Sequence, residues 1–438
     1  MTSKPNSNKT PIDPSDDHYL ETVTDLGEVE DIIAAEDVYS QSGALLIKQG
    51  AKINKKSYNA LVKHKLKDSI DNMVSVSNAV TNHELALDFY SQLEQFDLFK
   101  QLSPSIQNPE RLKNCLRQVD LNAAMRTKIS VAKKSDIDLY EHLLRVAIGS
   151  VMIGMFMHLN DNDCGILAVA GLFHDLGQLH IDPALLQAEK TLTAKELQFI
   201  YAHPLIMYQQ LIAIDAYPKE IALAILEHHE RIGGNGYPKG LSEYSNTYSA
   251  ILAITEVLIS MAESQPLDRV MVALKTNHTK FDKSVMNALF KVLVTREKPA
   301  NELEKTKQDL AVIEALLKDR VKHWREIEPD IKKQESSPLI KKLQTRMFEF
   351  RQSTRSWGID IEHEDLLINC GDEPDAIGEL VMLLEEALYI LRDICREFYR
   401  NKTLKDKSNI SDNIIEWVKC TKENIHNYSN NLLLDDVV

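Results

Sequence analysis

The sequence has few cysteines, and none of them stands at a spacing that would bind metal or organise a disulfide framework. There are five, an odd number, and no Cys-x-x-Cys motif occurs. This pattern argues against a disulfide-stapled fold and against a cysteine-based zinc site. We interpret the five as reduced thiols in a protein whose stability comes from an apolar core.

Long apolar runs and an excess of basic charge are also missing. The longest nearly apolar stretch, residues 146–159, is too short to cross a hydrocarbon layer of about 30 Å. The first 17 residues are polar and lack the apolar segment of a signal peptide. With 51 Lys and Arg against 65 Asp and Glu, the net charge is -14, so binding to duplex nucleic acid or to an anionic membrane surface is not expected. The sequence predicts a cytoplasmic protein without a membrane span.

Strand signals are sparse in this chain of 438 residues, and the hydrophobic share of 44% predicts a globular protein. Residues 31–66 alternate short apolar runs with turn residues such as Gly43 and Gly50, which predicts a hairpin followed by a helix from about Lys55. Elsewhere the apolar residues recur at helical spacing, so we expect a mainly α fold. The predicted parts are a disordered arm (1–30), a small α+β module (31–80), connecting helices (81–130), a central helical domain (131–298) and a helical C-terminal domain (299–438).

The C-terminal part has an apolar helical face that two architectures would explain. Leu380, Leu384, Leu388 and Leu391 fall on one side of a predicted helix. That side would suit a coiled coil or bundle that binds a partner, or a packed helical domain with no separate activity. The sequence leaves both alternatives open.

Histidines and carboxylates of the central domain are spaced as metal ligands on helices would be. Residues four apart share a helix face, so Asp138 and His142 can hold the same cation. His174 and Asp175 end an apolar helix just before Gly177. Because a buried unpaired carboxylate costs several kcal/mol, a cation or a firm hydrogen-bond partner is expected at Asp175.

Further along the chain, His203 begins another helical pattern and the adjacent His228 and His229 close an apolar helix, with Glu256 following on the next one. Imidazole and carboxylate together suit iron, manganese, zinc, nickel or cobalt better than magnesium or calcium. Paired cations about 3.5 to 4 Å apart clamp the oxygens of a phosphoryl displacement. The spacing therefore predicts a site with two or three metals that hydrolyses a phosphoester.

At these residues the sequence resembles the HD-GYP family, a branch of the HD phosphohydrolases whose best-known members hydrolyse the bacterial signalling molecule cyclic di-GMP. The resemblance covers residues 138–284 and is carried by the strings HDLGQ from His174 and HHERIGGNGYP from His228. It implies an HD-type helical bundle core holding two or three divalent transition metals, with iron or manganese favoured. The implied metal ligands are Asp138, His142, His174, Asp175, His203, His228, His229 and Glu256.

The resemblance also implies roles around the metals, with departures from the family pattern. Asp138 stands where the family has Glu, and Glu256 where it usually has Asp. Asp175 and Gln178 match catalytic positions, but Gln178 replaces a family Lys, and Gly233 replaces an Asp. A family Arg-Pro-Tyr-like string reads QPL at residues 265–267. The loop that follows the histidine pair suggests substrate-binding residues of its own, namely Arg231, Gly236, Tyr237, Pro238 and Lys239, in which Arg231 and Lys239 could supply the charge that Gln178 lacks.

Three functional hypotheses follow from the residues and the resemblance. The first is a phosphodiesterase in which a metal-bridging hydroxide attacks a cyclic dinucleotide, cyclic di-GMP. The second is a catalytically impaired adaptor that binds signalling proteins, which the departures at Gln178 and Gly233 favour. The third keeps hydrolysis but acts on a different phosphoester. The resemblance further suggests a homodimer formed through the long helices.

Overall fold

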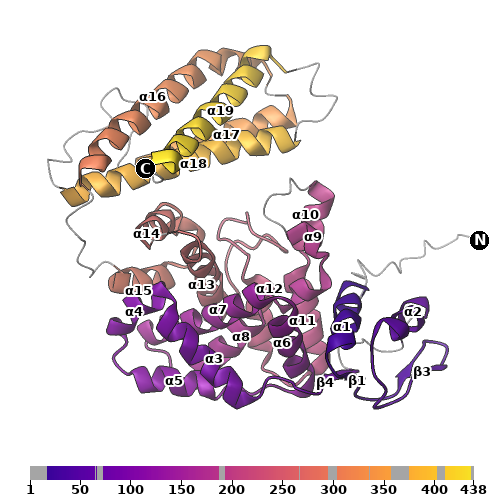
Figure 1. Cartoon of the computed structure of the whole chain (residues 1–438). Coiled ribbons are helices and arrows are strands. Elements are labelled where there is room, and N and C mark those ends of the chain that lie inside the picture. The colour runs from indigo at the N-terminus through magenta and orange to yellow at the C-terminus, as the bar shows by residue number, and fades with distance from the viewer. Residues whose placement is uncertain are drawn as a thin grey trace, which may run out of the picture. The chain divides into compact units, whose positions relative to one another are not determined.

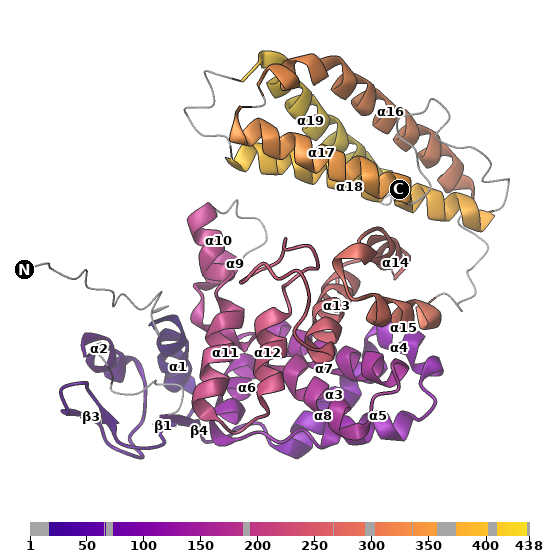
Figure 2. The same cartoon turned by 180° about the vertical axis from the view of Figure 1, so that it is seen from behind.

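The computed structural model describes residues 17–64, 66, 73–186, 193–265, 267–293, 303–334, 336–356, 374–401 and 410–435. Within it the chain forms two compact units, Met1–Ser264 with Thr279–Val294, and Gln265–His278 with Thr295–Val438. Helices dominate both units (Figures 1 and 2). The prediction of a mainly α protein is therefore confirmed, and each unit is described by itself below.

The first unit begins with a helix that the sequence had placed in the disordered arm. Residues 1–16 of that arm lie outside the described residues, but Asp17–Val29 form α1. Tyr19, Leu20 and Val23 are buried on one face of α1. The ring of Tyr19 stacks on His180 at 4.9 Å, and the Nζ atom of Lys128 lies 4.2 Å from the Tyr19 ring centre. Apolar burial and these ring contacts order the segment, so the expectation of disorder is wrong for residues 17–29.

The N-terminal module contains the predicted hairpin and a second strand pair. β2 (Val38–Tyr39) pairs with β3 (Leu45–Ile47) in antiparallel register around a turn at Gly43. The helix α2 (Lys55–Lys63) starts where the sequence predicts, with the Asn54 side chain capping it. β1 (Ile32–Ala34) pairs with β4 (Val74–Val76), a long-range pairing that the sequence did not predict.

Connecting helices lead from this module to the helices that carry the predicted metal-ligand residues. The first are α3 (Asn82–Gln95), α4 (Asp97–Leu102), α5 (Pro109–Arg117) and α6 (Ala123–Ser135). The ligand-bearing part has α7 (Ile137–Phe156), α8 (Asp161–Phe173), the 3-10 helix Leu176–His180, α9 (Pro183–Leu186), α10 (Ala194–Ile200), α11 (His203–Ile214), α12 (Lys219–Glu227) and α13 (Thr247–Ala262). α15 (Lys283–Leu293) also belongs to this unit.

The helix pair α7 and α8 forms the centre of this unit. A side chain at Gly171 would collide with the backbone of Ala147, so glycine lets the two helices approach closely. By length and composition α7 is apolar enough to cross a membrane, but 72% of its most apolar window is buried inside the protein. We therefore interpret α7 as the core helix of a packed domain.

The second unit contains α14 (Leu267–Thr276) and four long helices with a core of their own. These are α16 (Leu303–Lys333), α17 (Pro338–Ser356), α18 (Pro374–Asn401) and α19 (Asp412–Asp435), which lie side by side in both views (Figures 1 and 2). Leu380, Leu384, Leu388 and Leu391, which the sequence assigns to one helix face, are all buried in this core. α16 continues through Pro329.

Candidate metal centre

Five segments of the first unit bring the histidines and carboxylates together at one place. His142 comes from the second turn of α7, and His174 and Asp175 directly follow α8. His203 is the first residue of α11. Two groups of ligand atoms result, each with its atoms within 4.8 Å of one another. The first ligand group is Asp175, His203, His228 and His229, and the second ligand group is His142, His174, Asp175 and Glu256.

Asp175 belongs to both groups, and its two oxygens face different histidines. Oδ1 lies 2.9 Å from Nε2 of His203 and 3.4 Å from Nε2 of His228. Oδ2 lies 3.3 Å from Nε2 of His174 and 3.9 Å from Nε2 of His142. A carboxylate in this position can give one oxygen to each of two neighbouring cations.

Glu256 completes the second ligand group from the middle of α13. Its Oε2 atom lies 3.0 Å from Nε2 of His142 and 3.1 Å from Nε2 of His174. The other oxygen, Oε1, accepts a hydrogen bond from the hydroxyl of Ser260 at 2.7 Å. Glu256 is buried, so a carboxylate that is longer than the usual Asp of the HD-GYP family still reaches the site.

The histidine rings are oriented by hydrogen bonds at their outer nitrogens. Nδ1 of His174, His203 and His228 each donates to the carbonyl oxygen three residues earlier, at 2.7, 2.7 and 2.6 Å. Nδ1 of His142 lies 3.2 Å from both carboxylate oxygens of Glu263. A ring that donates through Nδ1 presents the lone pair of Nε2 to the centre, as a metal-ligating imidazole requires.

Burial and charge set the protonation states of the first ligand group in favour of metal binding. Burial lowers the pKa of His228 to about 4. It also lowers the pKa of His229 well below the usual value, and the neighbouring His228 and His203 add to this effect. Burial alone would raise the pKa of Asp175, but His174 and His203 hold it well below its usual range. At neutral pH this group therefore offers two neutral imidazoles and an ionised carboxylate.

The second ligand group holds protons more tightly. Burial opposes protonation of His174, but Asp175 and Glu256 outweigh it and raise the pKa of His174 to about 9. His142 behaves in the same way, because Glu256 and Glu263 raise its pKa well above the usual value despite burial. Near neutral pH a cation entering this group must displace these protons.

The residues of the first ligand group fit a divalent cation. In the described part of the chain, Oδ1 of Asp175 is buried and accepts no hydrogen bond. Nε2 of His203 lies only 3.3 Å from Nε2 of His228, although both rings already donate through Nδ1. Facing lone pairs and an unsatisfied carboxylate oxygen are unfavourable in a buried site. A cation would satisfy all three atoms.

Gly177 allows the two halves of the first ligand group to meet. A Cβ atom at this position would collide with the carbonyl oxygen of His203 and lie 2.9 Å from its carbonyl carbon. The turn after Asp175 can therefore pack on the start of α11 only because residue 177 has no side chain. Because the turn and the start of α11 pack closely, Nε2 of His203 comes within 2.9 Å of Oδ1 of Asp175.

The loop after the histidine pair is held by a buried carboxylate. Glu230 accepts hydrogen bonds from the backbone N–H groups of Lys239 at 2.6 Å, residue 240 at 3.2 Å and residue 241 at 2.9 Å. A Cβ atom at Gly236 would collide with the backbone of Glu230, so the loop passes close to it. Tyr237 is thereby stacked on His229 at 4.6 Å and on Tyr201 at 4.1 Å between ring centres.

Of the predicted metal ligands, Asp138 lies outside both ligand groups, and the other predicted residues lie around them. Asp138 is exposed in the first turn of α7 and is in neither ligand group. Gln178 donates from Nε2 to Oδ2 of Asp175 at 2.5 Å. Arg231 donates to the carbonyl oxygens of residues 228 and 230 at 3.0 and 2.6 Å. Pro238 and Lys239 are exposed on the loop.

Sequence reasoning missed three residues that shape the site. Glu263 lies seven residues after Glu256, two helical turns along the same face, so helical spacing alone could have indicated it. Glu230 directly follows the histidine pair, but nothing in the sequence shows that its carboxylate caps the loop. No sequence pattern indicates a role for Tyr201, because its contact with Tyr237 joins distant parts of the chain.

Comparison with known proteins identifies the domain in which both ligand groups lie. The family model described as HD domain matches residues 128–277. The chain is 28% identical over 160 residues to the cyclic di-GMP phosphodiesterase PdeB of Borreliella burgdorferi, covering 35% of this chain and 42% of that protein. It is 27% identical over 160 residues to the 3′3′-cGAMP-specific phosphodiesterase 3 of Vibrio cholerae, covering 35% of each.

The cyclic di-GMP phosphodiesterase response regulator RpfG of Xanthomonas campestris is 31% identical over 110 residues, 25% of this chain and 29% of that protein. The chain thus spans less than half the length of these curated relatives. A solved HDGYP-type protein from Bdellovibrio bacteriovorus matches 62% of this chain and 97% of its own at 16% identity, with a TM-score of only 0.34.

Proposed function

We propose that this chain, in which residues 128–277 match an HD domain, is a divergent member of the HD-GYP family and a metal-dependent phosphodiesterase that hydrolyses a cyclic dinucleotide. Cyclic di-GMP is the proposed substrate. The metal ligands are the two groups that share Asp175, and the proposed cations are iron or manganese.

The position of Asp175 is the observation that carries this proposal. Each of its oxygens faces a separate set of histidine nitrogens, which is how a bridging carboxylate holds two cations close together. Two divalent cations bound there would activate a water molecule and offset the charge that develops on the phosphate oxygens. HD domains bind divalent metals, which agrees with the donor set.

The surrounding residues have positioning roles in this proposal. The amide of Gln178 fixes the rotation of the Asp175 carboxylate through its hydrogen bond. Tyr237 covers His229 and keeps that ring in place. Glu230 fixes the loop that carries Tyr237 and the exposed Lys239, and we propose that the Lys239 ammonium contacts a substrate phosphate.

The names of the relatives support a cyclic dinucleotide and leave two candidates to compare. Two of the relatives are named for cyclic di-GMP and one for 3′3′-cGAMP. Both molecules carry two phosphodiester links in a ring and differ in one purine. The departures at Gln178 and Gly233 are not themselves in the ligand groups, so they bear on substrate contacts, and Gln178 also bears on the orientation of Asp175.

A noncatalytic adaptor is the second candidate function. One terminal nitrogen of Arg231 donates to backbone carbonyl oxygens, and the amide of Gln178 donates to Asp175, so these bonds compete with contacts to a phosphate. In that case the metal centre would be structural and the C-terminal helices would bind signalling proteins. The cytoplasmic location and the homodimer predicted from the sequence remain proposals that belong to either function.

The test is metal content and product analysis on the same protein sample. The full chain is purified without oxygen, its metals are measured by mass spectrometry, and cyclic di-GMP and 3′3′-cGAMP are incubated with it separately. The variant His174→Ala with Asp175→Ala removes ligands of both groups. The matched control, His83→Ala with Asp97→Ala, removes an exposed histidine and an exposed aspartate.

Two metal equivalents and a linear product, both lost in the ligand variant and kept in the control, would support the phosphodiesterase. Metal without turnover of either substrate would favour the adaptor or a different phosphoester. Metal that stays in the ligand variant would contradict the assignment of these residues as ligands.

A further inference from the structure

A basic hollow lies between two helices of the second unit, apart from any metal ligand. It has a volume of about 560 Å³ and is lined from α18 by Arg392, Arg396 and Tyr399. From α19 the lining side chains are Lys419, Lys422, Glu423 and His426. This size is within the range of small-molecule sites, which is roughly 300–1,000 Å³.

Helical spacing gathers these residues on facing sides of the two helices. On α18, Arg392 is followed by Arg396 one turn later and by Tyr399 after nearly two turns. On α19, Lys419 and Lys422 are three residues apart and share a face in the same way. Four Lys and Arg side chains thus meet a single lining carboxylate, in a chain whose net charge is -14.

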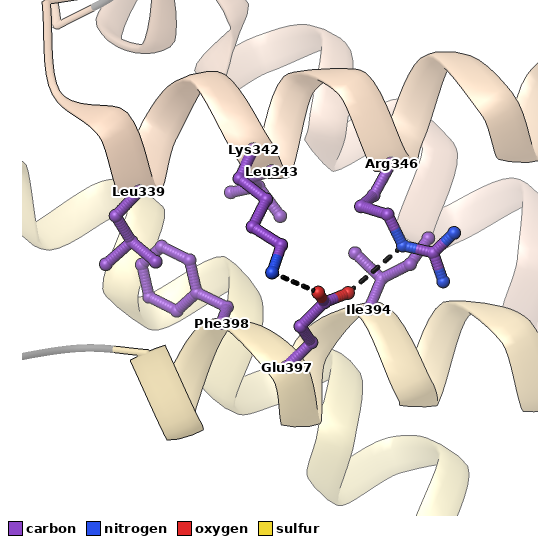
Figure 3. Close-up of a pocket in the computed structure, with 7 residues that line it drawn as sticks. All are labelled: Leu339, Lys342, Leu343, Arg346, Ile394, Glu397 and Phe398. Atoms are coloured by element: carbon purple, nitrogen blue, oxygen red, sulfur yellow. Dashed lines mark hydrogen bonds and ion pairs between the residues drawn. The ribbon is translucent and has the colours of Figure 1, made fainter. Parts of the chain in front are cut away.

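Some basic residues elsewhere in this unit are paired with carboxylates. In the small hollow between α17 and α18, Glu397 lies 2.7 Å from Nζ of Lys342 and 3.0 Å from Nε of Arg346 (Figure 3). By contrast, Arg392 and Arg396 form no ion pair with any residue that the structure describes. The same holds for Lys419 and Lys422 within the described ranges. The hollow is therefore a concentration of unbalanced positive charge.

Two of the basic side chains form cation–π contacts with tyrosine rings, which do not cancel their positive charge. The guanidinium of Arg392 lies 4.9 Å from the ring centre of Tyr389, and Nζ of Lys422 lies 5.6 Å from that of Tyr399. The Nε atom of Arg392 is buried and has no hydrogen-bond partner among the described residues. Burial and the neighbouring Arg396 lower the pKa of Arg392. Both observations show that the site, without an anion, leaves a donor and its charge unsatisfied.

We propose that this hollow binds a small organic phosphate of nucleotide size. Guanidinium groups bind phosphate oxygens through two parallel hydrogen bonds, and Lys adds charge. The tyrosine ring at the wall offers a surface for the organic part of the ligand. A concave site of this volume in a strongly acidic chain suits a small anion better than a membrane or a nucleic acid, which need extended basic surfaces.

Titration calorimetry on the full chain tests this proposal. The probes are inorganic pyrophosphate, AMP, and adenosine as the phosphate-free control. The protein carries His174→Ala with Asp175→Ala, so that phosphate binding at the proposed metal centre does not contribute. The hollow is altered by Arg396→Gln with Lys422→Gln, both exposed residues. The matched control is Lys332→Gln with Lys341→Gln, which removes two exposed charges on other helices.

We expect pyrophosphate and AMP to bind and adenosine not to bind. The hollow variant should weaken both probes by about tenfold or more, because charge-assisted hydrogen bonds are lost, and the control should not. Added salt should weaken binding as well. Absence of pyrophosphate binding would overturn the proposal, and so would equal binding by the hollow variant.

Discussion

Replacing Gly177 by alanine should break the first ligand group while leaving the rest of the fold in place. The added Cβ would lie 2.9 Å from the carbonyl carbon of His203 and would collide with its oxygen. Carbon atoms in ordinary contact are about 3.5–4.0 Å apart. The turn and the start of α11 must therefore separate by roughly 0.6–1 Å.

The size of this separation determines how much bound metal and how much folding stability the substitution should remove. Metal–ligand distances tolerate only about ±0.2 Å, and Oδ1 of Asp175 is set 2.9 Å from Nε2 of His203. A shift several times larger than the tolerance should remove His203 from the coordination. Overpacking of this kind also destabilises a fold by about 1–3 kcal/mol. We expect Gly177→Ala to lose about one metal equivalent and to unfold at lower urea concentration.

The chain offers a matched control for this change. Gly165 lies within α8 and has no atom within 4 Å of its would-be Cβ. Gly165→Ala should keep its metal and gain up to about 1 kcal/mol, because alanine is the better helix former. Metal content by mass spectrometry and urea unfolding of the metal-free protein measure both effects. Full metal content and unchanged stability in Gly177→Ala would refute the close-approach argument.

Three further predictions concern the same centre. Glu263→Gln should weaken metal binding at the second ligand group by about 10–100-fold, since it removes the carboxylate that orients His142; equal affinity in a metal titration would show that Glu263 does not act on that ring. Metal binding at the second ligand group should weaken as pH falls from about 9 to 6, because His174 then holds its proton. Metal binding at the first ligand group should change little over this range, because the pKa of His228 is about 4. Equal pH dependence of the two metal equivalents would contradict this prediction. Gln178→Lys should raise hydrolysis of cyclic di-GMP by roughly 10–100-fold, the effect of one charge-assisted contact worth about 1.5–3 kcal/mol; no gain would point to Gly233 or Gln265 as the larger departure.

Local patterns in the sequence were enough for much of the fold and for the types of metal ligand. The start of α2 and the hairpin at Gly43 depend on caps and turn residues within a few positions of each other. The adjacent histidines at 228 and 229 and the His174-Asp175 pair are visible as strings. Their association at one place is consistent with the HD domain match.

Other features depend on which helix face is buried, and local spacing does not decide that. Asp138 and His142 share one face of α7 by spacing, yet Asp138 is exposed and only His142 reaches the centre. The helix α1 looked like part of a polar arm, because its few apolar residues gain their burial only against distant partners such as His180. The pairing of β1 with β4 is likewise long-range.

The sequence by itself determined which ligand atoms are available at this site, because each His, Asp or Glu side chain has its own donor atoms and its own ordinary pKa range. It also determined where helices end and leave those side chains free to converge. Only the tertiary structure decided that the two oxygens of Asp175 face different histidines, that Gln178 is bonded to Asp175, and that four Lys and Arg side chains line one hollow with a single carboxylate among the lining residues. The physical reason is that these relations join residues from different helices, whose distances are fixed by packing and not by position along the chain.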